Sequence, residues 1–370
     1  MDRNRSFTIR SATAPSADVS ASDIISAWRG WLIACVASLV MFSGGCAAVQ
    51  GLFNSSTPGE RHGRELARIE RSSTIDEWLD VHARAILGDP ARISQMRGME
   101  VGVTLVSLGR REANLPVPVP MLGSHHGDRR APAGTMVAIP YAAYFFAHID
   151  RAPWGTDPNV RRNVAQMLSE GSTAAISFVL DAITETESGP PLEGPAFEQF
   201  RTRRYQVNDY LSEMGIHPPM RTGQKVWETA PYGRDFQLLG AAYTNENVVT
   251  ADSLARLMVL VERGVLGRRR EGDAMMKMMI RERDRPDASP ARGRILAANP
   301  TGVVAAFASR GEHHYHEAAI FHDPAGNAYV LAITTNRADA GAEFTAEIAR
   351  RARQAIDQRR LPVPTPAVVH

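Results

Sequence analysis

Two residue types that often carry chemistry, cysteine and lysine, are scarce in this 370-residue chain. The two cysteines, Cys35 and Cys46, both lie in the first fifth of the sequence. This placement excludes a disulfide framework or a cysteine-ligated metal site in the rest of the chain. Lysine occurs only at Lys225 and Lys277, so no lysine in the first half of the chain can serve as a local catalytic base.

The chain also has little net charge. The formal net charge is +2, and the densest basic run is three arginines at 268–270, which is typical of a solvated helix end. The composition therefore predicts no nucleic-acid partner. With 44% hydrophobic and 22% charged residues, the chain has the composition of a globular protein that buries one large core or two modest ones.

The first 46 residues predict a targeting segment. Arg29 precedes the apolar run WLIACVASLVMFSGG, which ends in small residues directly before Cys46. The pattern resembles a bacterial lipoprotein signal, so we expect lipid attachment at Cys46 and a lipid anchor in the membrane. An uncleaved anchor over 31–53 and a plain cleaved signal are the alternatives. Each of these predicts a body outside the cytoplasm, periplasmic, extracellular or held at the cell envelope, with 47–60 as a linker.

The apolar patterns of the remaining chain predict an α+β fold. Residues 101–109 are mostly apolar at both odd and even positions, as in a strand buried on both faces. Three further stretches, 302–310, 316–323 and 327–336, predict an antiparallel meander. Three prolines between 116 and 120 predict loop or broken edge strand over 110–134. Helical patterns cover 61–87, 135–146, 159–186, 203–216, 251–263, 275–280 and 344–356.

This order predicts an antiparallel sheet flanked by N- and C-terminal helices, with an inserted all-helical lobe at about 135–290. The predicted folded domain spans 61–360, followed by a tail at 361–370. Residues 217–247 are irregular, and a loop of that length is more often functional than idle. Thr250 is a good N-cap for the helix that follows it.

Several stretches resemble the class A β-lactamase and penicillin-binding serine transpeptidase family. The most specific is NENVVTADSLARLMVLVERGVL at 245–266, followed by MMKMM, which is similar to the threonine-capped helix and the next helix before the family's third strand. VNDYLSEMGI at 207–216 and the run from PTGVV at 300 to 335 add to the resemblance, which covers about residues 61–360. It implies the family's fold and a serine acyl-transfer site.

The family's Ser-x-x-Lys motif brings a nucleophile and a base onto one face of a helix. The match in this chain is Thr135-Met136-Val137-Ala138, inside APAGTMVAIPYAAYFF at 131–146. Threonine retains a hydroxyl, but Ala138 cannot accept its proton. The resemblance therefore implies Thr135 as the degenerate nucleophile position.

The family's two further motifs are also degenerate. Ser-Asp-Asn matches Ser169-Glu170-Gly171 in one register and Glu170-Gly171-Ser172 in another, so Ser169 and Ser172 are candidate binding residues without the asparagine. Lys-Thr-Gly matches Pro300-Thr301-Gly302, which predicts ligand contacts at Thr301 and Gly302 but removes the positive charge and one backbone donor.

Glu228 is the second candidate catalytic residue. Val226-Trp227-Glu228 resembles the family's Arg-Trp-Glu stretch, in which the glutamate activates the deacylating water. The asparagine expected four residues later is Tyr232, and a surface carboxylate is the alternative reading of Glu228.

Three other groups of residues contain side-chain types that occur in active or metal sites. Ser124, His125, His126 and Asp128 are residue types found in catalytic triads. Because triads are assembled from residues far apart in the sequence, the stretch more simply indicates a polar turn. His314 and His316 share a strand face and could offer two metal ligands, with His313, Glu312 and Glu317 nearby, yet a hairpin turn is favoured and no metal or other cofactor is predicted. Thr222-Gly223-Gln224-Lys225 spells Thr-x-x-Lys within the irregular loop and reads as accidental.

The sequence therefore predicts a β-lactamase-like protein of the cell envelope that is catalytically inactive. It would act by binding a cell-wall fragment, a small ligand or an envelope protein. The alternative is a divergent serine- or threonine-type hydrolase acting on β-lactams or peptidoglycan-related amides.

Overall fold

A computed structural model describes residues 68–112, 115–216, 220–227, 230–266, 269–279, 293–298 and 302–365, all of which fall in the second of the chain's two units, Ser56–His370. The predicted targeting segment with Cys46, and the linker at 47–60, lie outside the described residues. Among the helices that are described, none is long and apolar enough to cross a membrane.

Six strands of the described chain form one sheet in the order β1-β3-β2-β8-β7-β6. The pairings are antiparallel except that of β1 with β3. β2 is buried along its whole length, as its apolar alternations predict, and the predicted C-terminal meander is confirmed. The strands are β1 (Glu70–Arg71), β2 (Val101–Gly109), β3 (Met121–His125), β6 (Val303–Arg310), β7 (Tyr315–His322) and β8 (Ala328–Thr335).

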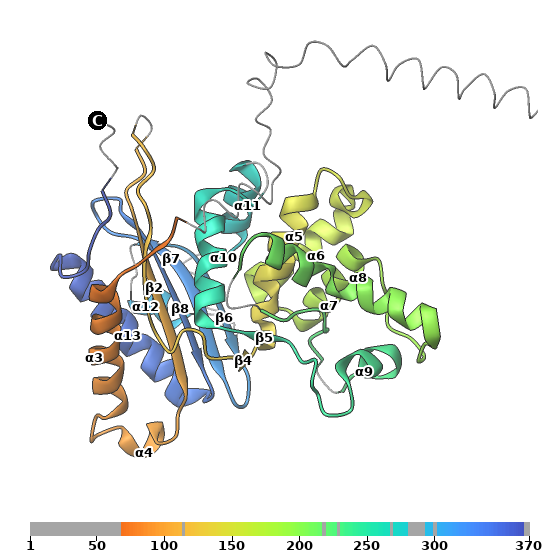
Figure 1. The fold of residues 1–370 in the computed structure, drawn as a ribbon, viewed down its shortest axis with the longest axis horizontal. Coiled ribbons are helices and arrows are strands. Elements are labelled where there is room, and N and C mark those ends of the chain that lie inside the picture. Colours follow the sequence, from red (N-terminus) through yellow and green to blue (C-terminus); the bar gives the residue numbers. More distant parts are fainter. Residues whose placement is uncertain are drawn as a thin grey trace, which may run out of the picture. The chain divides into compact units, whose positions relative to one another are not determined.

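The two faces of the sheet contact separate apolar layers, because successive side chains of a strand point to opposite faces. Leu105 and Ile333 belong to the layer covered by the terminal helices, whereas Val106 and Ala332 belong to the layer shared with α10 and the helical lobe. Figure 1 shows α3 and α13 on one side of the sheet and α10 on the other. The helices concerned are α3 (Ser73–Leu87), α4 (Ile93–Met96), α10 (Ala251–Arg263), α12 (Arg294–Ala298) and α13 (Asp339–Asp357).

The predicted helical lobe is present between β3 and β6, and α5 packs at its centre against α6, α7, α8, α10 and α11. The predicted α+β class is therefore confirmed. Outside the main sheet, β4 (Ala131–Pro132) pairs with β5 (Val248–Val249). The remaining elements are η1 (Gly134–Val137), α5 (Ala138–His148), η2 (Pro153–Thr156), α6 (Pro158–Glu170), α7 (Thr173–Thr184), α8 (Gly194–Glu213), α9 (Gly233–Leu239) and α11 (Arg269–Met279).

Two helix ends follow the local chemistry of the sequence. Ser72 is the N-cap of α3, and its side chain accepts a hydrogen bond from the amide of Ile75. Thr250 and Ser253 form a reciprocal capping box at the start of α10, and Gly264 ends that helix in the left-handed conformation.

The structure corrects the sequence prediction at five places. Residues 70–71, inside the predicted helical stretch 61–87, form the short strand β1, and α3 begins only at Ser73. β3 is a full strand between β1 and β2 instead of a broken edge, because the prolines lie before it and leave its amides free to pair with β2. The predicted helix over 159–186 is divided into α6 and α7 by Gly171 at φ 68°. The predicted helix at 203–216 begins earlier, at Gly194, and the irregular stretch contains α9.

Candidate functional site

Thr135 lies where the chain passes from the small β4–β5 ribbon into the buried α5. The amide of Ala133 donates to the carbonyl oxygen of Asn247 at 2.9 Å, which fixes the approach to η1. Gly134 then turns the chain with φ 52°, a conformation that favours glycine. Thr135 is therefore held half-buried at the beginning of a rigid helix, the place that the family resemblance assigns to the nucleophile.

The backbone amide of Thr135 is already bonded within the protein. It donates to the Oγ of Ser309 on β6 over 3.0 Å, and Ser309 is 2% exposed. Backbone amides at such positions are the usual donors to the oxyanion of an acyl-transfer intermediate. In this structure that donor faces a serine hydroxyl of the adjacent strand.

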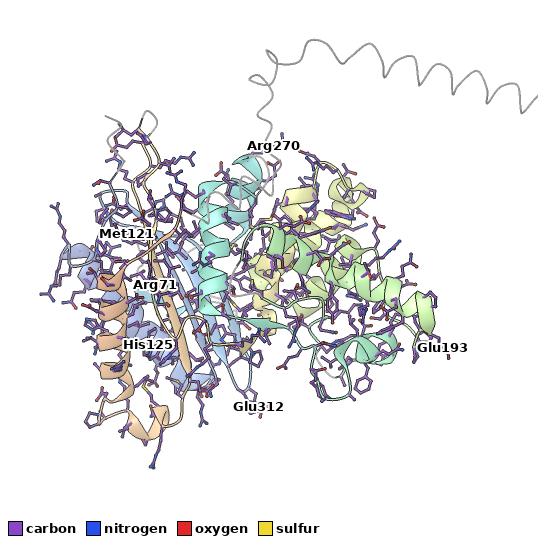
Figure 2. All side chains as sticks on the ribbon, in the orientation of Figure 1. Arg71, Met121, His125, Glu193, Arg270 and Glu312 are labelled. Carbon is purple, nitrogen blue, oxygen red and sulfur yellow. The ribbon has the colours of Figure 1, made fainter. Side chains whose placement is uncertain are left out.

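His314 completes a chain of hydrogen bonds behind Thr135. Its Nε2 lies 3.0 Å from the Oγ of Ser309. Burial, with the charge of His313, lowers the pKa of His314, so the ring is neutral near pH 7. The Oγ of Ser309 accepts from the amide of Thr135 and still has one proton and one lone pair, so it can either donate to the Nε2 of His314 or accept from it. Glu312, labelled in Figure 2, marks the β6–β7 turn from which His314 extends.

His316 fixes the position of His314. The two rings stack with centroids 4.6 Å apart. The Nε2 of His316 donates to the carbonyl oxygen of Pro132 over 2.7 Å, and its Nδ1 accepts from the amide of Thr335 over 3.2 Å. Burial lowers the pKa of His316 to about 3, in agreement with a neutral ring that has one donor and one acceptor nitrogen.

These contacts leave little room for a metal ion at the histidines. Both ring nitrogens of His316 already have partners, and Glu317 is buried on the other side of β7, where its carboxylate accepts from the amides of Arg294 and Ile295 at 2.7 and 2.9 Å. Across the described residues there is no group of three His, Cys, Asp or Glu side chains arranged to hold a metal ion.

Gly134 shows how closely His314 covers the start of the helix. A Cβ atom at Gly134 would lie 2.3 Å from the Nε2 of His314 and 2.5 Å from the Oγ of Ser309. Both distances are shorter than real side chains allow. The ring of His314 therefore lies directly against the backbone that precedes Thr135.

The position of the general base is aliphatic. Ala138 is fully buried at the beginning of α5, three residues after Thr135. Lys225 does not replace it, because its ammonium group donates to Asp181 and, over 2.7 Å, to the Oγ of Ser188. Lys277 is exposed on α11.

Lys225 belongs to a buried ion-pair cluster of the helical lobe. Arg204 is fully buried and donates to Asp181 over 2.7 Å and to Asp235 over 3.1 Å. Burial raises the pKa of Asp181, while the charges of Arg204 and Lys225 oppose that shift. Thr222 and Lys225, which match the Thr-x-x-Lys pattern, do not form a common site. The hydroxyl of Thr222 donates to Asn208, whereas Lys225 donates to Asp181.

The other predicted binding residues are dispersed. Ser172 is the N-cap of α7, where its Oγ accepts from the amide of Ala175 over 3.2 Å, and Ser169 lies half-buried in the last turn of α6. No hydrogen bond given for the described residues joins either serine to Thr135. Glu228 and Thr301 lie outside the described residues, so their roles stay predictions.

Gly302 is described but lies far from Thr135. Its carbonyl oxygen accepts from the amide of His322 over 2.7 Å at the start of β6. Ser309 is seven residues further along β6, roughly 23 Å at about 3.3 Å per residue. The strand residue that meets the nucleophile position is therefore Ser309, which the sequence reasoning missed. The pairing of Ser309 with His316 across the predicted hairpin is the signal that could have found it.

The polar turn predicted at 124–128 also has its own partner. The Nδ1 of His125 lies 2.5 Å from Oδ1 of Asp80 on α3. This hydrogen bond lowers the pKa of Asp80. His125, labelled in Figure 2, therefore joins β3 to α3.

Comparison with known proteins shows that the fold is that of class A β-lactamases and PBP-like serine enzymes. A mutant of PBP-A in an acyl-enzyme complex with penicillin G is 17% identical, with 76% of this chain and 97% of that chain covered and a TM-score of 0.51. A β-lactamase from Sphaerobacter thermophilus DSM 20745 is 18% identical, with 76% and 98% covered and a TM-score of 0.51. At these identities the likeness establishes the fold alone.

The family is indicated by sequence as well. Residues 200–357 match the model described as the Beta-lactamase enzyme family. The predicted resemblance to class A β-lactamases and penicillin-binding enzymes is therefore confirmed. No match was found among curated proteins.

The contact between Gly134 and His314 gives a direct test of the site. Gly134→Ala should lower the free energy of unfolding by more than the roughly 1–2 kcal/mol of a left-handed alanine, because the new methyl group meets His314 and Ser309. In a His314→Ala background part of this penalty should disappear, giving a coupling of about 1 kcal/mol in a denaturant double-mutant cycle.

Gly98→Ala is the matched control, because Gly98 also has a positive φ of 71° but nothing within 4 Å of the added Cβ. Equal penalties at Gly98 and Gly134, with no coupling to His314, would show that the ring does not cover the helix start.

Proposed function

We propose that this chain is an extracytoplasmic β-lactamase-like protein that has lost acyl-transfer catalysis and acts by binding at the cell envelope. The ligand would be a cell-wall fragment, a small molecule or an envelope protein. The proposal combines the confirmed fold with the local chemistry around Thr135.

The observation that carries the proposal is that Thr135 has neither a free oxyanion donor nor a base. Its amide donates to Ser309, and Ala138 offers no nitrogen or oxygen to accept the hydroxyl proton. Loss of general acid–base assistance costs on the order of 10² to 10⁴ in rate, and loss of one oxyanion donor about 10² to 10³. Together these losses leave Thr135 a very poor nucleophile.

The ring of His314 adds a steric argument. A substrate carbonyl approaching Thr135 as in acyl transfer needs the space near the amide that Ser309 and His314 already fill. Binding beside this closed position does not require that space. The arrangement therefore favours recognition of a ligand over its cleavage.

One observation favours a hydrolase as the second candidate. The Oγ of Ser309 and the Nε2 of His314 lie 3.0 Å apart, and the lowered pKa of His314 keeps the ring in its basic form. This is the pairing of nucleophile and base used in acyl transfer. Its weakness is that Ser309 is 2% exposed, so a substrate reaches it only after His314 moves.

Intact-mass analysis after incubation with penicillin G separates the two candidates. We expect no mass increase on the purified protein, while Thr135→Ala leaves non-covalent ligand binding unchanged and His314→Ala alters it. A stoichiometric adduct mapped to Thr135 would overturn the loss of catalysis. An adduct mapped to Ser309, and abolished by His314→Ala, would establish the hydrolase instead.

Attachment to the membrane through Cys46 has its own test. We expect the expressed protein in the membrane fraction of a bacterial host, and Cys46→Ser in the soluble fraction, because the lipidated cysteine would be lost. Cys35→Ser is the matched control and should leave the distribution unchanged. If Cys46→Ser stays membrane-bound, the uncleaved anchor at 31–53 becomes the better account.

A further inference from the structure

A polar pocket lies in the helical lobe, and none of its lining residues belongs to the hydrogen-bonded group around Thr135. It has a volume of 420 Å³, within the range of about 300–1,000 Å³ usual for small-molecule sites. Its lining residues are Arg130, Tyr205, Asn208, Asp209, Ser212, Met220, Arg221, Asn245 and Val248.

The pocket has two walls of different chemistry. One wall is α8, where Tyr205, Asp209 and Ser212 follow one another at helical spacing and share a face. The other wall comes from the segments beside β4 and β5, which carry Arg130 and Arg221. Cationic groups therefore stand on one wall, and an acid and a hydroxyl on the other.

The arginine wall is held by backbone pairing. Arg221 forms a bridge with Val248 through amide–carbonyl hydrogen bonds of 3.0 and 2.8 Å, and Val248 belongs to β5, whose partner β4 follows directly after Arg130. The Nε of Arg221 also donates to the carbonyl oxygen of Glu246 over 2.9 Å. This bond orients the guanidinium group and leaves both of its terminal amino groups for another acceptor.

Asn208 on α8 joins the two walls of the pocket by hydrogen bonds to Thr222, the residue after Arg221. Its amide oxygen accepts from the amide and the hydroxyl of Thr222 at 2.7 and 2.9 Å, and its amide nitrogen donates to the carbonyl oxygen of Thr222 at 2.9 Å. A site whose walls are fixed before binding loses less conformational freedom when a ligand enters.

The charged groups of the pocket have no ion-pair partners within the described part of the chain. No salt bridge there includes Arg130, Arg221 or Asp209. The charge of Arg221 also acts on Tyr205, opposing the rise in the pKa of that phenol that burial causes. Two arginines and one carboxylate therefore face the same space unpaired with each other.

From this arrangement we propose that the pocket binds a zwitterionic ligand of amino-acid or short-peptide size. The ligand's carboxylate lies at the guanidinium groups of Arg130 and Arg221, whose planar donors match a carboxylate. Its ammonium group faces Asp209 and the hydroxyl of Ser212. The site is independent of the proposed function, because none of its residues contacts Thr135, Ser309 or His314 through a hydrogen bond given for the described chain.

Calorimetric titration of the full chain with the dipeptide alanyl-alanine tests this proposal. We expect binding in the micromolar to millimolar range, at least tenfold weaker for the C-terminal amide of the dipeptide and several-fold weaker for its N-acetyl form. Arg221→Gln and Arg130→Gln should each raise the Kd at least tenfold. Asp209→Asn should weaken binding of the dipeptide with a free amino group but leave the affinity for the N-acetyl form unchanged.

Arg203→Gln is the matched control, because Arg203 lies on α8 but lines a different pocket, and it should leave the Kd unchanged. Arg221→Gln also removes the hydrogen bond to the carbonyl oxygen of Glu246 and could therefore destabilise the fold. Among the described residues Arg130→Gln removes no such bond, so a raised Kd with unchanged thermal unfolding in that variant reports on binding and not on misfolding. His314→Ala should not alter dipeptide binding, so the outcome of this test is distinguishable from that of the test of the proposed function at Thr135. Undetectable binding at millimolar dipeptide, or equal affinity for the amide, would overturn the proposal.

Discussion

The hydrogen bond from the amide of Thr135 to the Oγ of Ser309 joins the helical lobe to the sheet at the place where the fold would otherwise hold an acyl-transfer centre. It connects the start of α5, the central helix of the lobe, to β6 at the sheet's edge. Ser309 in turn contacts His314, and His314 rests on His316, which is anchored to Pro132 and Thr335. This connected group explains why the backbone at Gly134 has no room for a side chain.

The same group lies beside a helix that the fold needs whether or not the site is catalytic. α5 stays because nearly all of its side chains are buried in the core of the lobe, including Ile139, Tyr141 and Phe145. Ala138, at the position of the family motif's lysine, is fully buried and has a high helix propensity, so it suits the packing of this helix. The burial of α5 therefore accounts for its place in the fold without any catalytic role.

The sequence predicted the elements that depend on local chemistry or on a strong apolar period. β2, the C-terminal meander, the Thr250 cap and the apolar face of α13 follow from residues within one element. β3 was not predicted as a full strand because its burial comes from partners distant in sequence, β1 and β2. The break at Gly171 was missed because both flanking segments have helical patterns.

The candidate site was only partly predictable for the same reason. Thr135 and Ala138 are read from one motif, whereas Ser309 reaches Thr135 across 174 positions of sequence. The motif match at 300–302 lies before the start of β6, whereas Ser309 lies near its end, because a short sequence motif does not report where a strand meets its neighbours. The histidines at 313, 314 and 316 form a visible pattern in the sequence, but the contact of His314 with the start of the helix depends on tertiary structure alone.

The most direct test of this account is hydrogen exchange at the Thr135 amide, followed by NMR. The account predicts slow exchange in the unmodified protein, exchange at least tenfold faster in Ser309→Ala, and no shift of the Thr135 resonance on addition of penicillin G. The amide of Gly223, which donates to the Tyr141 hydroxyl over 3.1 Å, serves as an internal control that Ser309→Ala should leave unchanged. Rapid exchange at Thr135 in the unmodified protein, or a shift of its resonance with penicillin G, would contradict the account.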